Sequence, residues 1–193
     1  MKKIALLVGA VLFLTACTVE YNDPKPPRAF KGGENATVIV REYGDFQCPA
    51  CGTAYDQLKD LPTKYGDKVR WEFYHFPLTS IHPYAYNASL AAECANDQGK
   101  FWDYHDTLFE NQAELTRKDL YAYAELVGLD ADLFDACFRS KAKASVVRGD
   151  MQDGNAMEIN STPTFYVNDE ELENWTRLEV VLDAAVATTT PEN

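Results

Sequence analysis

The sequence has little positive charge, and its N-terminal apolar run is too short to cross a bilayer. It contains 18 Lys and Arg against 30 Asp and Glu, for a net charge of −12. Such an acidic chain lacks the basic surface that binds nucleic acid, so we expect no nucleic-acid partner. No internal repeat is visible. The 193 residues, 46% of them hydrophobic, suffice for the core of one ordinary domain.

The first residues have the pattern of an export signal. Lys2 and Lys3 precede an apolar run over 4–14, and Leu14-Thr15-Ala16-Cys17 follows at once. These four residues resemble the bacterial lipobox, in which the cysteine is lipidated after cleavage. We therefore expect a lipoprotein signal peptide over 1–16 and a lipid on Cys17. The alternative is an ordinary secretory signal with a coincidental cysteine.

The next segment is rich in proline, glycine and polar residues and has no hydrophobic period. The pattern predicts a lipidated N-terminus and flexible tether over 17–36. The expected location is the bacterial cell envelope, anchored by lipid and facing the periplasm or the exterior. In that oxidising compartment the four cysteines other than Cys17 can persist as disulfides.

The rest of the chain alternates between strand and helix patterns. β-Branched and aromatic runs predict strands over 37–43 and 69–76, with a helix after Cys48 between them. Helical spacing runs through 83–159, followed by strands at 164–167 and 170–173 and a helix over 178–187. This order predicts an α/β domain over 37–187, β-α-β then β-β-α, with an inserted all-helical subdomain at about 83–159. Residues 188–193 form a tail.

Cys48-Pro49-Ala50-Cys51 is the main candidate for chemistry. The motif follows a predicted strand and opens a helix, with Pro49 in the first turn, where proline is favoured. Unpaired N–H groups and the helix dipole at that position stabilise a thiolate and lower the pKa of Cys48. Cys51, one turn later, is placed to resolve a mixed disulfide. The pattern predicts thiol–disulfide exchange.

Other uses of the two thiols fit the sequence less well. A structural disulfide across two intervening residues closes too short a loop to stabilise the fold much. A zinc site needs two more ligands with paired spacing, and haem attachment needs histidine where Gly52 stands. We predict no metal site and no cofactor.

A proline precedes the third predicted strand. In Thr162-Pro163-Thr164, a cis bond would expose the backbone of Thr162 for pairing with an extended substrate. A trans proline that simply begins a strand is the plain alternative.

Four stretches together resemble the DsbA-like branch of the thioredoxin superfamily over residues 35–187. They are Glu42-Tyr-Gly-Asp-Phe-Gln-Cys-Pro-Ala-Cys51, His75-Phe-Pro-Leu78, Ala91-Ala-Glu-Cys-Ala-Asn-Asp-Gln-Gly-Lys-Phe-Trp102 and Thr162-Pro-Thr-Phe165. The resemblance implies a thioredoxin fold with a helical insertion and a cis Thr162–Pro163 bond opposite Cys48. It also implies dithiol–disulfide exchange with proteins.

The resemblance assigns a role to Glu42 as well. In the family pattern a buried acid six residues before the first cysteine moves the proton of the inner cysteine, here Cys51. The alternative is that Glu42 faces solvent at the end of its strand. The chain also departs from strongly oxidising members, because Pro49-Ala50 supplies no histidine between the cysteines. The site is therefore expected to be less oxidising.

Cys94 and Cys137 lie in the predicted insertion, away from the motif. We favour a structural disulfide between two helices, which would stabilise the fold by about 2–4 kcal/mol. A second redox pair and two buried free thiols are the alternatives.

The sequence thus predicts an exported protein disulfide oxidoreductase, with Cys48 as nucleophile, Cys51 as resolving thiol and Pro163 beside the substrate. Its expected partners are exported proteins with thiols or disulfides and a membrane redox partner that recycles the motif. The alternative function is a lipid-anchored soft-metal-binding module or metallochaperone that uses the same thiols.

Overall fold

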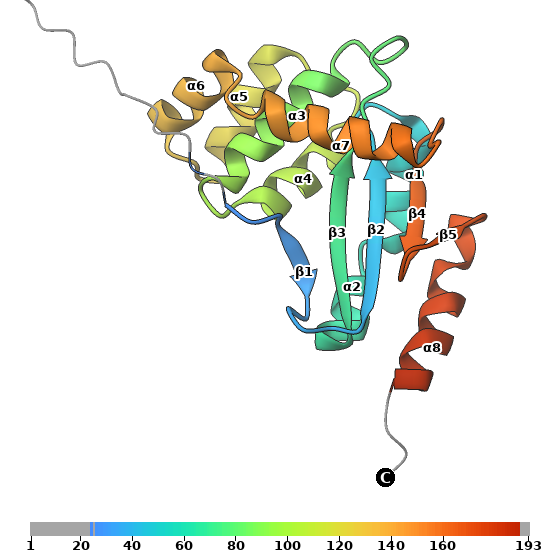
Figure 1. Cartoon of the computed structure of the whole chain (residues 1–193). Helices are drawn as coiled ribbons and strands as arrows, with labels where there is room; N and C mark the ends of the chain where they lie inside the picture. Colours follow the sequence, from blue (N-terminus) through green and yellow to red (C-terminus); the bar gives the residue numbers. More distant parts are fainter. Residues whose placement is uncertain (1–23, 25, 190–193) are drawn as a thin grey trace, which may run out of the picture.

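The computed structural model describes residue 24 and residues 26–189. The expected signal peptide and Cys17 lie outside these residues. Figure 1 shows one sheet with a cluster of helices at the end where β2 and β3 finish and a separate helix, α8, beside β4 and β5.

Five strands form a single mixed sheet in the order β1-β3-β2-β4-β5. They are β1 (Phe30–Gly32), β2 (Val38–Gly44), β3 (Val69–His75), β4 (Thr164–Val167) and β5 (Glu170–Leu172). β2 and β3 are parallel, whereas β1 pairs antiparallel to β3, β4 to β2 and β5 to β4. The predicted order of strand, helix and strand at the start of the domain is confirmed.

The register puts two sets of side chains on opposite faces of the sheet, because strand residues alternate in direction. Val40 is paired with Trp71 and with Val167, and these three share the face on which Glu42 also lies. α1 (Pro49–Leu58), α2 (Leu61–Tyr65) and α8 (Leu178–Thr189) pack on this face through Ala54, Leu61 and Leu182. α7 (Ala144–Ala156) covers the other face, where its Gly154 lies against Tyr43 and Phe76.

The helical insertion follows β3 as predicted. It consists of α3 (Ala85–Asn96), α4 (Phe101–Glu110), α5 (Arg117–Leu126), α6 (Ala131–Ser140) and α7. Thr116 begins α5 with a capping box that includes Asp119, and the side chain of Asp130 caps α6 by accepting from the backbone N–H of Leu133. A shared core joins the insertion to the active-site end of the sheet through Phe46, Phe73 and Phe101.

The predicted tether is wrong for its C-terminal part, because residues 28–33 belong to the fold. β1 pairs with β3, and the Arg28 guanidinium lies between the carbonyl oxygen of Phe73 at 2.7 Å and the carboxylate of Asp150. Lys31 forms an ion pair of 2.8 Å with Asp106. The prolines and glycines around 24–33 concealed a strand of only three residues, too short to show a period.

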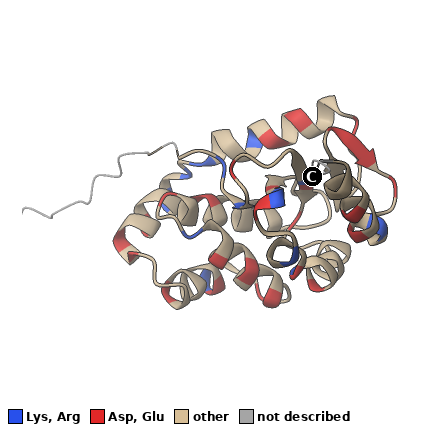
Figure 2. Ribbon diagram, turned by 90° about the horizontal axis from the view of Figure 1, so that it is seen from below, with Lys and Arg blue, Asp and Glu red and all other residues tan. Residues whose placement is uncertain are grey.

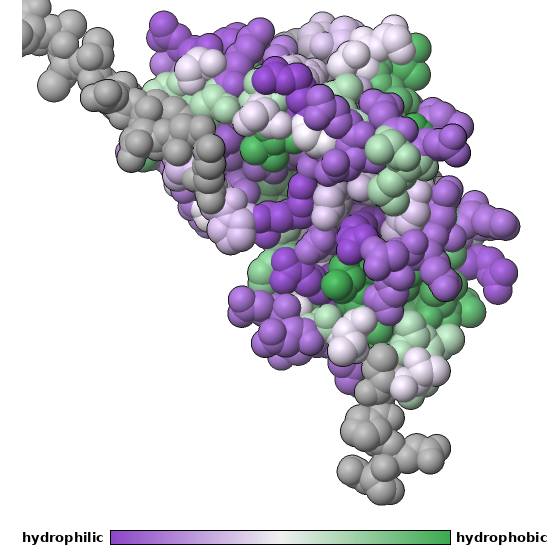
Figure 3. Space-filling model, in the orientation of Figure 1, coloured by the Kyte–Doolittle hydropathy of each residue, from purple (hydrophilic) through white to green (hydrophobic). Residues whose placement is uncertain are grey.

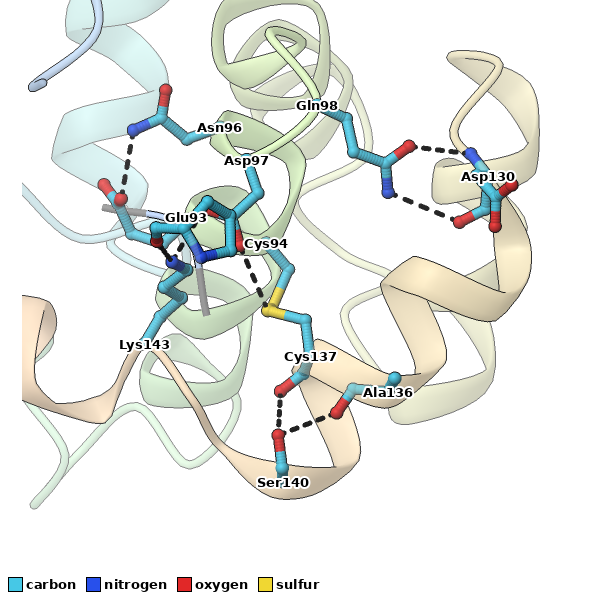
Figure 4. Close-up of a disulfide and its surroundings, with 11 residues drawn as sticks. Glu93, Cys94, Asn96, Asp97, Gln98, Asp130, Ala136, Cys137, Ser140 and Lys143 are labelled. Atoms are coloured by element: carbon cyan, nitrogen blue, oxygen red, sulfur yellow. Dashed lines mark hydrogen bonds and ion pairs between the residues drawn. A yellow bond between two sulfur atoms is a disulfide. The ribbon is translucent and has the colours of Figure 1, made fainter. Parts of the chain in front are cut away.

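Cys94 and Cys137 form a disulfide between α3 and α6, with their Cα atoms 5.8 Å apart (Figure 4). Beside it, Asp97 and Lys143 form an ion pair of 2.6 Å in which both side chains are almost fully buried. The disulfide and the ion pair together hold α3, α6 and the start of α7 at one end of the insertion.

The surface is predominantly acidic and polar. Figure 2 shows Asp and Glu on most helices and fewer Lys and Arg, and hydrophilic residues cover most of the face in Figure 3. No helix in the described part of the chain combines the length and the apolar character needed to cross a membrane.

Candidate active site

Cys48 stands at the N-terminus of α1, where its φ of −73° and ψ of 121° turn the chain from β2 into the helix. Pro49 begins the helix and needs no hydrogen-bond partner for its nitrogen. A hydrogen bond from the Cys51 side chain lowers the pKa of Cys48 to about 5. Burial opposes this shift, and Thr162 and the backbone N–H groups of Cys51 and Ala50 support it. Cys48 is therefore a thiolate at neutral pH.

Cys51 has the opposite electrostatic environment. It is fully buried one turn inside α1, and burial raises its pKa well above the ordinary value. The hydrogen bond with Cys48 and the nearby Glu42 raise it further. The two thiols are both free in this structure, and only Cys48 is ionised near neutrality. The arrangement places an ionised sulfur next to a buried, protonated one.

The loop before β4 lies against Cys48. The Thr162–Pro163 peptide bond is cis, and Cys48 Sγ lies 3.2 Å from the carbonyl oxygen of Thr162, to which the thiol donates when it is protonated. The Thr162 hydroxyl is buried and has no other partner among the described residues, which leaves it able to donate to the thiolate. The structure thus brings together the two stretches around Cys48 and Pro163, which are 115 positions apart in the sequence.

Glu42 lies on the face of the sheet that α1, α2 and α8 cover, and it is paired with Phe73 on β3 and Phe165 on β4. Its Oε1 is buried and has no hydrogen-bond partner among the described residues. Burial raises its pKa to about 8, so the carboxyl is largely protonated at neutral pH. Glu42 is close enough to Cys51 to raise the pKa of its thiol, so a buried carboxyl lies near the inner cysteine.

Asp45, a residue that the sequence reasoning did not select, shapes the turn before Cys48. Its fully buried carboxylate accepts from the backbone N–H of Gln47 at 2.7 Å and of Leu78 at 2.8 Å, and from His82 Nδ1 at 2.7 Å. It therefore fixes the loop after β3 against the start of α1. The signal available in the sequence was an acid between Gly44 and Phe46, three positions before Cys48.

Gln112 is the second residue that sequence reasoning missed. It follows α4, and its Nε2 donates to the carbonyl oxygens of Cys48 at 2.7 Å and Phe46 at 3.0 Å. A Cβ at Gly52 would lie 2.5 Å from Gln112 Oε1, so the absence of a side chain there lets the amide approach. These bonds tie the insertion to the first turn of α1.

In the described part of the chain, no group of three or more His, Cys, Asp or Glu is arranged to hold a metal ion. Cys94 and Cys137 are engaged with each other in the insertion. The remaining candidate, Cys17, lies outside the described residues.

Comparison with known proteins places these features in a family. The family model described as Thioredoxin matches residues 25–184. Among solved structures, oxidised BdbD from Bacillus subtilis superposes with a TM-score of 0.72 and 26% identity, covering 83% of this chain and 93% of that one. The thiol-disulfide exchange protein alpha-DsbA2 from Wolbachia pipientis gives a TM-score of 0.71 at 18% identity, covering 82% and 87%.

The curated relatives are much longer proteins. The Na(+)/H(+) antiporter NhaA 1 of Mycobacterium sp. (strain KMS) is 41% identical over 140 residues, which are 72% of this chain and 23% of the antiporter. The chain thus spans about a quarter of the length of such relatives. The match over residues 25–184, together with the DsbA-type helical insertion and the Cys48–Cys51 site, shows that the chain belongs to the thioredoxin family and resembles its DsbA-like thiol–disulfide oxidoreductases.

Proposed function

We propose that this protein is an exported thiol–disulfide oxidoreductase that exchanges a Cys48–Cys51 disulfide with cysteines of other exported proteins. The observation that carries the proposal is the contrast between two adjacent thiols. Cys48 is stabilised as a thiolate at the start of α1, whereas burial keeps Cys51 protonated one turn inside.

The exchange begins with the oxidised protein. A substrate thiolate attacks Cys48 Sγ, the bond between Cys48 and Cys51 breaks, and Cys51 leaves as a thiolate that takes a proton from Glu42. A second substrate thiolate then attacks the substrate sulfur of the mixed disulfide, and Cys48 leaves as a stabilised thiolate. The reverse sequence, in which Cys48 of the reduced protein attacks a substrate disulfide and Cys51 resolves the mixed disulfide, uses the same two thiols.

Thr162 contributes the contact surface for the substrate. Its carbonyl oxygen and hydroxyl lie beside Cys48 and are free to meet an extended peptide once the Cys48 thiol has reacted. Pro163 holds this backbone next to the sulfur. Substrates are therefore expected to bind as extended segments.

The protein is proposed to act at the bacterial cell envelope, held by a lipid on Cys17 and recycled by a membrane redox partner. Relatives in which a similar stretch is part of an Na(+)/H(+) antiporter support a position at a membrane. Metabolic labelling with a fatty acid tests the anchor: wild type should carry the label, and Cys17→Ser should not. Equal labelling of both would contradict it.

Turnover with protein substrates tests the function itself. Wild type should reoxidise reduced ribonuclease and reduce insulin, and Cys48→Ser should lose both activities. Cys51→Ser should accumulate a mixed disulfide through Cys48, because no resolving thiol remains. Equal activity of Cys48→Ser and wild type would contradict the function.

A further inference from the structure

A narrow cavity of about 50 Å³ lies between the sheet, α1 and α4, and Glu42 forms part of its wall. Trp71, Trp102 and His105 also line it. Each of these four residues has a buried polar side-chain atom with no hydrogen-bond partner among the described residues: Glu42 Oε1, Trp71 Nε1, Trp102 Nε1 and His105 Nε2. A water requires about 15 Å³ and two to four polar partners. The cavity is large enough for water, and the four residues with unpartnered polar atoms all line it.

His105 is held in one orientation by its neighbour. Its Nδ1 lies 2.8 Å from Asp106 Oδ1, and Asp106 in turn lies 2.8 Å from Lys31 Nζ at the half-exposed edge of the cavity. A neutral imidazole that donates from Nδ1 to a carboxylate has a lone pair on Nε2. His105 Nε2 is therefore a proton acceptor that lines the same cavity as the carboxyl of Glu42.

The charges around this pair favour transfer in both directions. Burial lowers the pKa of His105, so the ring is neutral at rest and can take up a proton. Burial alone would raise the pKa of Asp106, but its hydrogen bonds with His105 and Lys31 outweigh this and lower it. Asp106 thus stays a carboxylate that stabilises a transient imidazolium. The other titratable groups at the cavity and beside Glu42 are Lys31, Tyr55, Lys59, Glu72 and Cys51.

We propose that His105 exchanges the proton of Glu42 with solvent through water in this cavity. The inference rests on the proposed function. Glu42, which rests protonated, first gives its proton through water to His105 Nε2, and the resulting carboxylate takes the thiol proton when Cys51 attacks the mixed disulfide at Cys48. The imidazolium releases its proton from Nε2 to water at the edge of the cavity beside Asp106 and Lys31, so the ring returns to the tautomer with its proton on Nδ1. No electron leaves the sulfur atoms in these steps, and the charge of each group is restored. His105 acts through Glu42 and is a positioning residue.

Single-turnover reaction of the reduced protein with 5,5′-dithiobis(2-nitrobenzoate) separates the two thiols. The first nitrothiobenzoate released reports attack by Cys48, and the second reports resolution by Cys51. His105→Gln keeps a hydrogen-bonding side chain that cannot take up or release a proton. It should leave the first phase unchanged and slow the second about tenfold or more. Glu42→Gln should slow the second phase as well, and the double variant should be no slower than the slower single variant.

The matched control is His75→Gln, since His75 is also a buried histidine but does not line the cavity. Both phases should stay within about twofold of wild type. A second phase that slows in Glu42→Gln but not in His105→Gln would overturn the role of His105 and leave the proposed function intact. Two normal phases in Cys48→Ser would instead overturn the function.

A measurement on wild type keeps the inference testable if His105→Gln fails to fold. Ring-nitrogen NMR should show His105 with a proton on Nδ1 and none on Nε2 at neutral pH. A proton on Nε2 would make this nitrogen a donor and would overturn the relay.

Discussion

Gln112 Nε2 donates to the carbonyl oxygen of Cys48 at 2.7 Å, from a loop 64 positions further along the chain. The same nitrogen donates to Phe46 at 3.0 Å, so one side chain binds the backbone on both sides of the turn into α1. The position of Cys48 therefore depends on the insertion as well as on the sheet.

Gln112→Met keeps the length of the side chain and removes both donors. We expect the free energy of unfolding to fall by about 1–2 kcal/mol, because two carbonyl oxygens lose a partner. Amide hydrogen exchange in 46–52 should become faster. Gln98→Met is the control, since Gln98 makes similar bonds with the backbone of Asp130 within the insertion. Unchanged exchange in 46–52 for Gln112→Met would contradict the contact.

Arg28→Met tests whether the N-terminal segment is part of the fold. Asp150 is 3% exposed and would keep a buried charge without its guanidinium partner. We expect a loss of about 3 kcal/mol in denaturant unfolding. Lys64→Met, which removes exposed ion pairs with Glu179 and Asp183, should cost much less, because solvent screens these charges. Equal losses in the two variants would argue against a buried role for Arg28.

Two glycines of α7 should respond to alanine in opposite directions. A Cβ at Gly154 would lie 2.7 Å from the buried ring of Phe76, whereas one at Gly149 would meet nothing within 4 Å. Gly149→Ala should raise the midpoint of thermal unfolding, with a gain of about 0.5–1 kcal/mol from helix propensity. Gly154→Ala should lower the midpoint, because overpacking reduces the free energy of unfolding by about 1–3 kcal/mol. The reverse order would contradict the packing of α7 on the sheet.

Glu42 should make stability depend on pH. Its pKa is raised to about 8 in the folded protein, so between about pH 4.5 and 8 the unfolded chain ionises while the folded one stays protonated. The folded state binds more protons in this window, and its contribution to stability falls as pH rises, by at most about 5 kcal/mol.

Cys48 has the opposite slope in the reduced protein, because its pKa is lowered to about 5. Because both proteins contain Cys48, its contribution cancels when the free energies of unfolding of wild type and Glu42→Gln are subtracted. Glu42→Gln should therefore gain stability over wild type progressively from pH 5 to pH 8 in urea unfolding, and the exposed control Glu125→Gln should not. A constant difference across this range would indicate an ordinary carboxyl at position 42.

Local patterns predicted most of the fold. The β-branched run in 37–43 and the aromatic-rich run in 69–76 indicated β2 and β3, whose side chains alternate between the two faces of the sheet. The same alternation leaves the face of Glu42 undecided until the neighbours of β2 are known. The pairing with Phe73 and Phe165 puts Glu42 on the face that α1, α2 and α8 cover.

Contacts between distant residues could not be predicted in this way. Gln112 belongs to no motif, and its role depends on how the insertion docks on α1. The cavity at His105 likewise exists only after α4, β1 and the sheet have packed together. Asp45 stood within a quoted stretch, but only the loop after β3 reveals its partners.

The most direct test of the proposed function is the titration of Cys48. In wild type, thiolate absorbance of the reduced protein should rise with a midpoint near pH 5. Cys51→Ala should shift that midpoint upward, because the main hydrogen bond that stabilises the Cys48 thiolate is lost. Cys48→Ser should show no absorbance change in this range. A wild-type midpoint near pH 9, the value of an ordinary thiol, would contradict an activated nucleophile at Cys48.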